Sequence, residues 1–206
     1  MENKSYHILP LTETQIPSAG ALLTEAFFAD PLTVSLFPDT RERTRMFTWY
    51  YTATIRGLAP FQGIYATAGS VKGVAVWDPP GTKEEAPEWT ERADAGAYRR
   101  FLKVIDYLTS LRQSTVSGPF WYLSWIGVAS THQRKGLGSA LLAPVLLQAD
   151  QAGLSCHLET FEQKNLLFYQ RHGFEIVFAQ IEPESNVPFW TMKREPRELT
   201  YVLGAG

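Results

Sequence analysis

The sequence predicts a mixed α/β fold, with helices packed on a sheet, for a chain of 206 residues. Strand-like segments come early, and from about residue 121 onward apolar strands and helices alternate, an order typical of layered α/β proteins. The composition is that of an ordinary globular protein, with 45% hydrophobic and 19% charged residues. We therefore expect a single domain over residues 1–206.

The first part of the chain predicts a strand, two helices and a hairpin. Thr12 is a suitable N-cap for the first helix, and Asp30-Pro31 ends that helix, because the residue before a proline is displaced from the α region. The hairpin turns at Gly69-Ser70. The expected elements are a strand at residues 6–9, helices between 12 and 30 and at 40–55, and strands at 63–68 and 71–77.

The second part predicts helices and strands in alternation. Gly173 follows the last helix, where a left-handed residue would cap it. The expected elements are a helical stretch at 84–112, a strand at 121–129, a helix at 137–152, a strand at 156–160, a helix at 165–172, and strands at 175–181 and 188–193.

The net charge argues against polyanionic partners, and the cysteine content indicates the kind of compartment. The net charge is -2 and the isoelectric point is about 6.1, so no basic field is available for a nucleic-acid backbone or an anionic membrane. A single cysteine, Cys156, cannot form an intrachain disulfide, which fits a reducing compartment. The sequence has no signal-peptide-like start and no run of 18 apolar residues, and we expect a cytoplasmic protein.

The sharpest motif is a glycine-containing turn between a strand and a helix. Gly136 and Gly138 allow a ligand to approach the backbone closely, and Arg134 and Lys135 add positive charge beside them. The free N–H groups of the first helical turn and the helix dipole would attract a pyrophosphate. The spacing fits neither G-x-x-x-x-G-K-[ST] nor G-x-G-x-x-G, so a Walker loop and a classical dinucleotide fingerprint are excluded. A glycine pair alone is more often a turn without a ligand.

Two motifs in series resemble one family. The segment from Gln133 to Gly138 resembles the [QR]-x-x-G-x-[GA] turn of the GNAT superfamily of acetyl-CoA-dependent N-acetyltransferases. The segment from Asn165 to Phe174 is similar to that family's N-x-x-x-Y-x-x-x-G-F helix. The resemblance implies a GNAT-like α/β (α+β) fold, with a mixed and mostly antiparallel central sheet, a splayed parallel strand pair and helices on both faces.

Within the superfamily the chain is most similar to puromycin N-acetyltransferase-like members. The shared features are the Gly138-Ser139-Ala140 run, Pro144 inside the helix, the strand Leu158-Glu159-Thr160, the pair Phe168-Tyr169, and Ala26-Phe27 followed by Asp30-Pro31. The resemblance implies an acceptor-side half at residues 1–117 and an acetyl-CoA-binding core at 118–194.

Acetyl-CoA is the cosubstrate that the resemblance implies. The turn would hold the pyrophosphate, and the strand before it would pair with the pantetheine arm, with Gly127 suited to a bulge or splay that opens the gap. The residues implied to contact acetyl-CoA are Ile126, Gly127, Val128, Gln133, Arg134, Lys135, Gly136, Leu137, Gly138, Ser139 and Asn165.

Tyr169 and Glu159 are the predicted catalytic residues. Tyr169 follows Asn165 by four residues, so both lie on one helical face, and the resemblance assigns the tyrosine to the thioester sulfur. Proton transfer from a phenol with a pKa of about 10 to a thiolate whose thiol has a pKa of about 8.5 is unfavourable, so we expect a hydrogen bond to the sulfur. Glu159 could accept the amine proton, or could simply be a surface glutamate. Glu25 and Asp30 are weaker candidates.

The four histidines and the cysteine do not predict a metal site or a nucleophile. His7, His132, His157 and His172 form no metal-ligand spacing, and no second cysteine is present, so no metal is expected. Cys156 is expected to pack as a small apolar residue, because His157 points to the other face of the strand.

The predicted reaction is transfer of an acetyl group from acetyl-CoA to the amine of a small-molecule acceptor, by direct attack in a ternary complex. The 13% aromatic content favours an apolar or aromatic amine. Two alternatives stay open: acetylation of a peptide or protein amine, for which an acidic groove would be expected, and a non-catalytic CoA-binding module. Both a monomer and a homodimer are compatible with the sequence.

Overall fold

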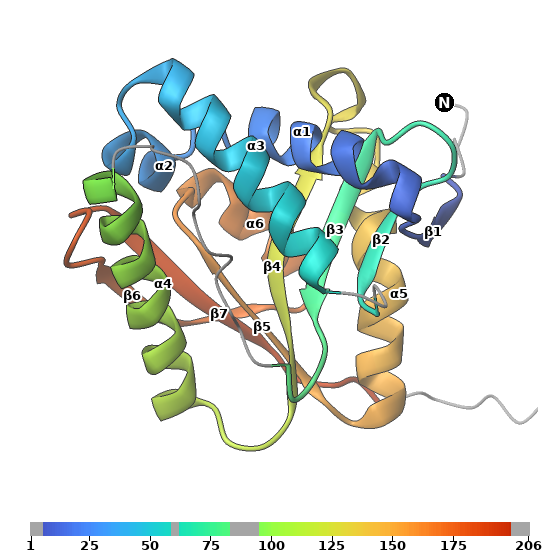
Figure 1. The fold of residues 1–206 in the computed structure, drawn as a ribbon. Coiled ribbons are helices and arrows are strands. Elements are labelled where there is room, and N and C mark those ends of the chain that lie inside the picture. Colours follow the sequence, from blue (N-terminus) through green and yellow to red (C-terminus); the bar gives the residue numbers. More distant parts are fainter. Residues whose placement is uncertain (1–5, 59–61, 83–94, 199–206) are drawn as a thin grey trace, which may run out of the picture.

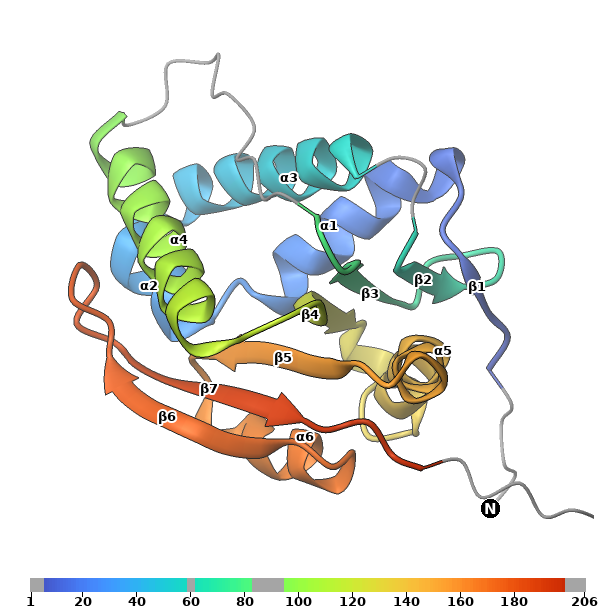
Figure 2. The same cartoon turned by 90° about the horizontal axis from the view of Figure 1, so that it is seen from below.

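The computed structural model describes residues 6–58, 62–82 and 95–198, which form a seven-stranded sheet with helices on both faces (Figure 1, Figure 2). The strand order is β1-β2-β3-β4-β5-β7-β6, and every neighbouring pair is antiparallel except β4 and β5. The strands are β1 (Ile8–Pro10), β2 (Ile64–Thr67), β3 (Gly73–Asp78), β4 (Phe120–Val128), β5 (Ser155–Thr160), β6 (Glu175–Ile181) and β7 (Pro188–Arg194). The predicted fold class is confirmed.

The helices divide between the two faces of this sheet. Figure 2 shows α1 to α4 on one side and α5 and α6 on the other. The helices are α1 (Ile16–Ala26), α2 (Pro31–Leu36), α3 (Thr40–Gly57), α4 (Ala95–Thr115), α5 (Leu137–Ala152) and α6 (Leu166–Arg171), with short 3-10 turns η1 (Glu13–Gln15), η2 (Ser130–His132) and η3 (Gln163–Asn165). No helix in the described ranges combines the length and apolar character that crossing a bilayer requires.

Most of the predicted elements appear within a few residues of their expected bounds. One local prediction needs correction: α1 ends at Ala26, so Asp30-Pro31 does not end this helix but begins the next one. Pro31 is the first residue of α2, and the Asp30 carboxylate accepts a hydrogen bond from the Leu32 N–H at 2.9 Å. The expected helical stretch at 84–112 falls partly outside the described residues, and within them α4 begins at Ala95.

Strand β3 separates two apolar cores. Val74 and Val76 face α1, α3 and α4, whereas Ala75 and Trp77 face α5, because successive side chains of a strand point to opposite faces. All six residues of β3 are buried, since helices cover both sides of the sheet at this point. Helix α5 continues through Pro144 without a break.

Strands β4 and β5 are paired over only a short distance. Their parallel register runs from Phe120↔Ser155 to Tyr122↔His157. Beyond these pairs β4 stays bonded to β3 alone and β5 to β7 alone among the described residues. The two strands therefore separate towards their carboxyl ends, which confirms the expected splayed pair.

The bulge in β4 is at Ser124 and not at Gly127. Val76 pairs with Trp125 and Trp77 pairs with Leu123, so Ser124 is the extra residue. Gly127 stays in register, and its missing side chain serves packing instead. A Cβ there would lie 2.9 Å from Leu22 Cδ2, so the glycine allows α1 to approach the sheet.

Candidate active site

The turn between β4 and α5 has an unusual backbone. Arg134 has φ 57° and Gly136 has φ 83°, both in the left-handed region. Glycine adopts this region freely, but an arginine does so at a cost of about 1 kcal/mol or more. Strain of this kind persists only where the surrounding structure holds it, and it is frequent at functional sites.

This turn presents a row of N–H groups with no protein acceptor. Within the described ranges, no backbone N–H from residue 134 to residue 139 donates a hydrogen bond of normal geometry. The next donor, Ala140 N–H, bonds to Gly136 O at 3.1 Å. Apart from the glycine and its two chain neighbours, no described residue has an atom within 4 Å of the position that a Cβ of Gly136 would occupy. Donors at the positive end of a helix dipole thus face open space, which suits an anion with several acceptor oxygens.

The polar side chains of the turn mainly shape the turn itself. Gln133 Nε2 donates to Val128 O at 3.1 Å, and Lys135 Nζ donates to Thr131 O at 2.6 Å. These two bonds tie the turn back to the end of β4 and to η2. The side chains of Arg134 and Ser139 are exposed, and both were predicted to contact the cofactor.

Gly138 has a packing role that the sequence did not reveal. A Cβ at this position would lie 3.1 Å from the Phe168 ring, so the glycine lets α6 approach the start of α5. The Phe168 ring also contacts Tyr169, with ring centroids 5.2 Å apart. The glycine turn and Tyr169 are therefore linked through one aromatic side chain. Leu137, between the glycines, is buried in the core.

Tyr169 is buried in the core on the α5 side of the sheet. Only 6% of the residue is exposed, and it packs with Phe174 and Leu158 in the core on the α5 side. Burial raises the pKa of Tyr169 well above its usual range, and the negative charge of Asp30 adds to this effect. The phenol therefore keeps its proton at physiological pH and is available as a hydrogen-bond donor.

The remaining predicted cofactor residues lie along the same side. Ile126 and Val128 pack against the core that contains α5, and Asn165 is a half-buried residue at the start of α6. They lie, with the glycine turn, around the region where β4 has no strand partner on its β5 side.

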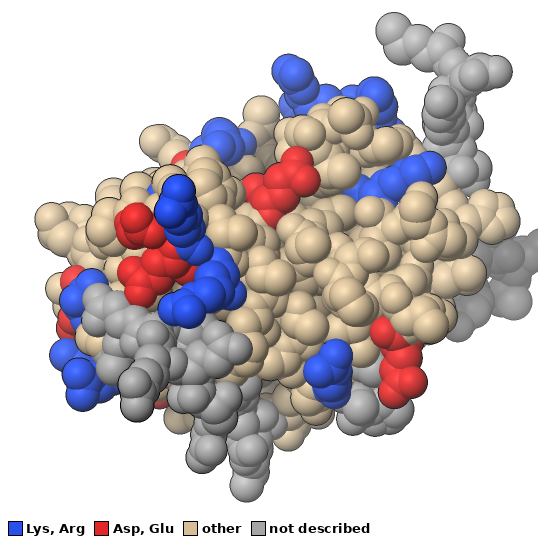
Figure 3. All heavy atoms as spheres, turned by 45° about the horizontal axis from the view of Figure 1, so that its top comes forward, with Lys and Arg blue, Asp and Glu red and all other residues tan. Residues whose placement is uncertain are grey.

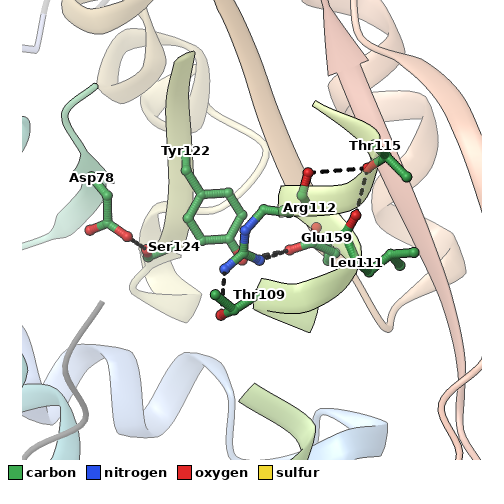
Figure 4. A network of polar contacts seen from close by, with 8 residues as sticks. All are labelled: Asp78, Thr109, Leu111, Arg112, Thr115, Tyr122, Ser124 and Glu159. Carbon is green, nitrogen blue, oxygen red and sulfur yellow. Dashed lines mark hydrogen bonds and ion pairs between the residues drawn. The ribbon is translucent and has the colours of Figure 1, made fainter. Parts of the chain in front are cut away.

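Glu159 lies on the opposite face, in a buried ion pair. Its Oε2 accepts hydrogen bonds from Arg112 Nη1 at 2.7 Å and from the Tyr122 hydroxyl at 2.6 Å (Figure 4). The Glu159 side chain is 2% exposed and that of Arg112 is 5% exposed. The guanidinium also lies over the Tyr122 ring, 3.7 Å from its centroid. The role of Glu159 as the base stays a prediction, and its Oε2 is engaged by two donors.

A second buried carboxylate on this face was missed by the sequence analysis. Ser124 Oγ donates to Asp78 Oδ2 at 2.7 Å, and Asp78 is 8% exposed (Figure 4). Asp78 follows an apolar strand directly before Pro79-Pro80, so in the sequence it looks like an ordinary strand end. Nothing local signals that β4 brings Ser124 to it.

Aromatic side chains border these polar groups. Trp125 is half-buried and packs edge-on against Tyr50 and Tyr51, with centroids 5.8 and 5.2 Å away. Asp30 lies near enough to raise the pKa of Tyr51, after burial as the main cause. Burial also raises the pKa of Asp30 to about 6, against the opposing effect of hydrogen bonds from backbone N–H groups. Glu25 is exposed and accepts a 3.4 Å hydrogen bond from Ser130.

Cys156 and His157 have the environments expected of structural residues. Burial raises the pKa of Cys156 to about 12 and lowers that of His157 to about 4. The thiol and the imidazole are thus both neutral at physiological pH, and they lie on opposite faces of β5. Among the described residues, no group of three His, Cys, Asp or Glu side chains is arranged to hold a metal ion.

Comparison with known proteins agrees with this geometry. Residues 97–176 match the family model of the acetyltransferase (GNAT) domain. An uncharacterized N-acetyltransferase of Schizosaccharomyces pombe is 28% identical over 203 aligned residues, which cover 86% of this chain and 78% of the relative.

Two solved structures share the fold at low sequence identity. A Corynebacterium glutamicum structure described as histone acetyltransferase HPA2 and related acetyltransferase has a TM-score of 0.64 at 22% identity. The match covers 95% of this chain and 99% of that one. Arylalkylamine N-acetyltransferase 2 of Aedes aegypti has a TM-score of 0.63 at 10% identity, covering 94% and 100%. With its splayed parallel strands and its glycine turn, the chain carries a GNAT acetyltransferase domain and is a homologue of an N-acetyltransferase.

Proposed function

We propose that this protein transfers an acetyl group from acetyl-CoA to the amine of a small molecule, by direct attack in a ternary complex. The observation that carries the proposal is the row of backbone N–H groups at residues 134–139, which lead into helix α5 and donate to no acceptor among the described residues. A diphosphate supplies the negative charge and the acceptor oxygens that such a row can bind. The left-handed Gly136 leaves the approach to these groups open.

The separated strands support the placement of the acyl arm. In this proposal the pantetheine runs beside Ile126, Gly127 and Val128, on the edge of β4 that β5 leaves without a partner, and Asn165 contacts it from α6. Tyr169 would donate its hydroxyl proton in a hydrogen bond to the thioester sulfur. Its raised pKa favours this role over full proton transfer, because a phenolate would be harder to form.

Two features support a small-molecule acceptor. The half-buried Trp125, backed by the buried rings of Tyr50 and Tyr51, lies on the acceptor side of β4 and suits an apolar or aromatic amine. On the face that Figure 3 shows, basic and acidic side chains are interspersed around broad uncharged areas, with no concentrated acidic field among the described residues. A basic protein tail would favour such a field. Similarity to puromycin N-acetyltransferase-like members, and the arylalkylamine enzyme among the structural neighbours, also support this class.

Calorimetry with acetyl-CoA and with CoA tests whether the protein binds the cofactor. Measuring the free thiol released from acetyl-CoA in the presence of each of a panel of amines tests the reaction. We expect micromolar binding and thiol release with at least one small apolar amine. Binding without turnover of any amine would favour a CoA-binding module. A clear preference for basic peptides would favour a protein acetyltransferase, and absence of binding would remove the proposal.

A further inference from the structure

We propose that Asp78 and Ser124 form the pair that takes the proton from the acceptor amine. The inference rests on the proposed function, and it concerns which carboxylate of the α1–α4 face serves the reaction. It is carried by three observations: the place of Ser124 in the sheet, its hydrogen bond to Asp78, and the hydrogen bonds that Glu159 accepts from Arg112 and Tyr122.

Ser124 lies where β4 and β5 begin to separate. It is two residues beyond Tyr122, the last residue of β4 that pairs with β5. As the extra residue of the bulge, it interrupts the alternation of side chains. Ser124 contacts Asp78, and Trp125 contacts the rings of α3, so two consecutive side chains point to the same face. A regular strand would turn one of them away.

Asp78 lies directly behind this serine. It is the last residue of β3 and pairs with Tyr122 in the sheet register. The Ser124 hydroxyl donates to its Oδ2 at 2.7 Å, a length typical of a strong bond to a carboxylate. The hydroxyl oxygen keeps lone pairs that can accept from an amine N–H, while its own proton is already directed at Asp78. The pair thus has the geometry of a two-step proton relay.

The other carboxylate on this face is arranged differently. Glu159 Oε2 accepts from both Arg112 and Tyr122, and this ion pair is almost fully buried. Figure 4 shows the Tyr122 ring between Asp78 on one side and the Arg112–Glu159 pair on the other. Among the described residues, the titratable and charged groups on this side of Asp78 include the Tyr122 phenol and, beyond it, the ion pair of Arg112 and Glu159. We infer that Glu159 positions Tyr122 and that Asp78 receives the proton.

The reaction balances with this assignment. An acceptor arrives as the ammonium ion and gives one proton through Ser124 Oγ to Asp78 Oδ2. The freed lone pair of nitrogen forms the C–N bond to the acetyl carbon, and the C–S bond breaks with its electron pair on sulfur. The sulfur takes the second N–H proton, and Asp78 returns the first to water.

The test compares Asp78→Asn and Ser124→Ala with the wild type, using acetyl-CoA and two amines. The amine of 2-phenylethylamine has a pKa of about 10, and that of phenylalanine amide about 8. At pH 7 we expect Asp78→Asn to lower kcat/KM about 100-fold for the first amine and about 10-fold for the second, because the second is already partly neutral. Ser124→Ala should lower it about 10-fold. Both losses should shrink as the pH approaches the pKa of the amine.

Controls separate this role from a structural one. Asp106→Asn, at an exposed position of α4, should leave kcat/KM and its pH profile unchanged. Binding of acetyl-CoA by Asp78→Asn, measured by calorimetry, should stay within about twofold of the wild type. A loss equal for both amines at every pH would show a structural role and overturn the inference, as would a wild-type profile in both variants. A pH-dependent loss in Glu159→Gln alone would assign the base to Glu159. A wild type that consumes no acetyl-CoA with any amine would remove the proposed function, and this inference with it.

Discussion

The two faces of the sheet at the point where β4 and β5 separate are built in different ways. On the α5 side, the glycine turn, Phe168 and Tyr169 come from one stretch, residues 133–169, and each element forms by local turn and helix geometry. On the α1–α4 side, Asp78, Arg112 and Glu159 come from three elements far apart in the chain. The first face offers backbone donors and one phenol, whereas the second offers buried charges and aromatic rings. A motif can describe the first face, but only tertiary packing creates the second.

The largest expected effect concerns the buried charges of the α1–α4 face. Arg112→Met should lower the free energy of unfolding by about 3 to 5 kcal/mol, because it leaves the Glu159 carboxylate buried without its counter-ion. Urea denaturation measures this. The double variant Arg112→Met with Glu159→Gln should recover most of the loss, since no net charge is then buried.

Lys103→Met provides the matched control for this prediction. Lys103 lies on the same helix and pairs with Glu184, but its side chain is 67% exposed. Its loss should change stability by less than about 1 kcal/mol. Equal effects of the two substitutions would show that the buried pair contributes no more than a surface one.

The next effect concerns the backbone of the α5 side. Gly136→Ala should weaken acetyl-CoA binding about 30- to 100-fold, because a Cβ disfavours the left-handed conformation that opens the row of N–H groups. Gly153→Ala is a close control: this glycine caps the other end of α5, is also left-handed (φ 65°), and also has open space around it. Both variants should lose similar stability, but only Gly136→Ala should lose affinity in calorimetry. An affinity loss in both would mean that general destabilisation explains the result.

Tyr169→Phe probes the point where the two faces meet. We expect kcat to fall about 10- to 30-fold with little change in acetyl-CoA affinity, because the hydroxyl would act on the sulfur as it leaves. Since burial raises the pKa of Tyr169, kcat of the wild type should show no loss from ionisation of this phenol up to about pH 9. Unchanged turnover in the variant would remove Tyr169 from the mechanism.

The smallest effect concerns Asp30, which caps α2 close to both sites. Its folded-state pKa of about 6 lies above the usual 3.8, so the folded protein binds this proton more tightly than the unfolded chain. The wild type should therefore lose stability as the pH rises from about 4 to about 6 and stay at the lower level above that. Asp30→Asn keeps the cap and removes the buried charge, and should stabilise the protein by about 1 kcal/mol at pH 7.5. At pH 4 the two proteins should melt alike.

The sequence predicted the α5 side with little error. The bounds of α5 and β6 match their expected ranges, and the parallel pair with its splay follows from the resemblance. Two predictions there needed the structure. The bulge lies at Ser124 rather than Gly127, and Gly127 instead allows α1 to approach the sheet. Gly138 allows close contact with Phe168, and no local sequence pattern reveals this contact.

The predicted base illustrates the limit on the other face. The sequence favours Glu159 because it lies on the strand after the glycine-turn helix, yet its partner Arg112 lies 47 residues earlier in the chain. Asp78 and Ser124, 46 residues apart, gave no signal at all. A charge pattern within one strand cannot reveal which helix covers it, so burial and partners on this face were not predictable.

What the sequence determined by itself is the set of features that depend on neighbours along the chain: the order of strands and helices, the left-handed glycine before α5, and the helix that bears Tyr169. Turn conformation, capping and hydrophobic period act over a few residues, so they can be seen in one dimension. The tertiary structure decided which carboxylates are buried, which donors engage them, and that a bulge brings Ser124 to Asp78. Those outcomes depend on the packing of α4 and β3 against β4 and β5, which sums many weak contacts between distant segments.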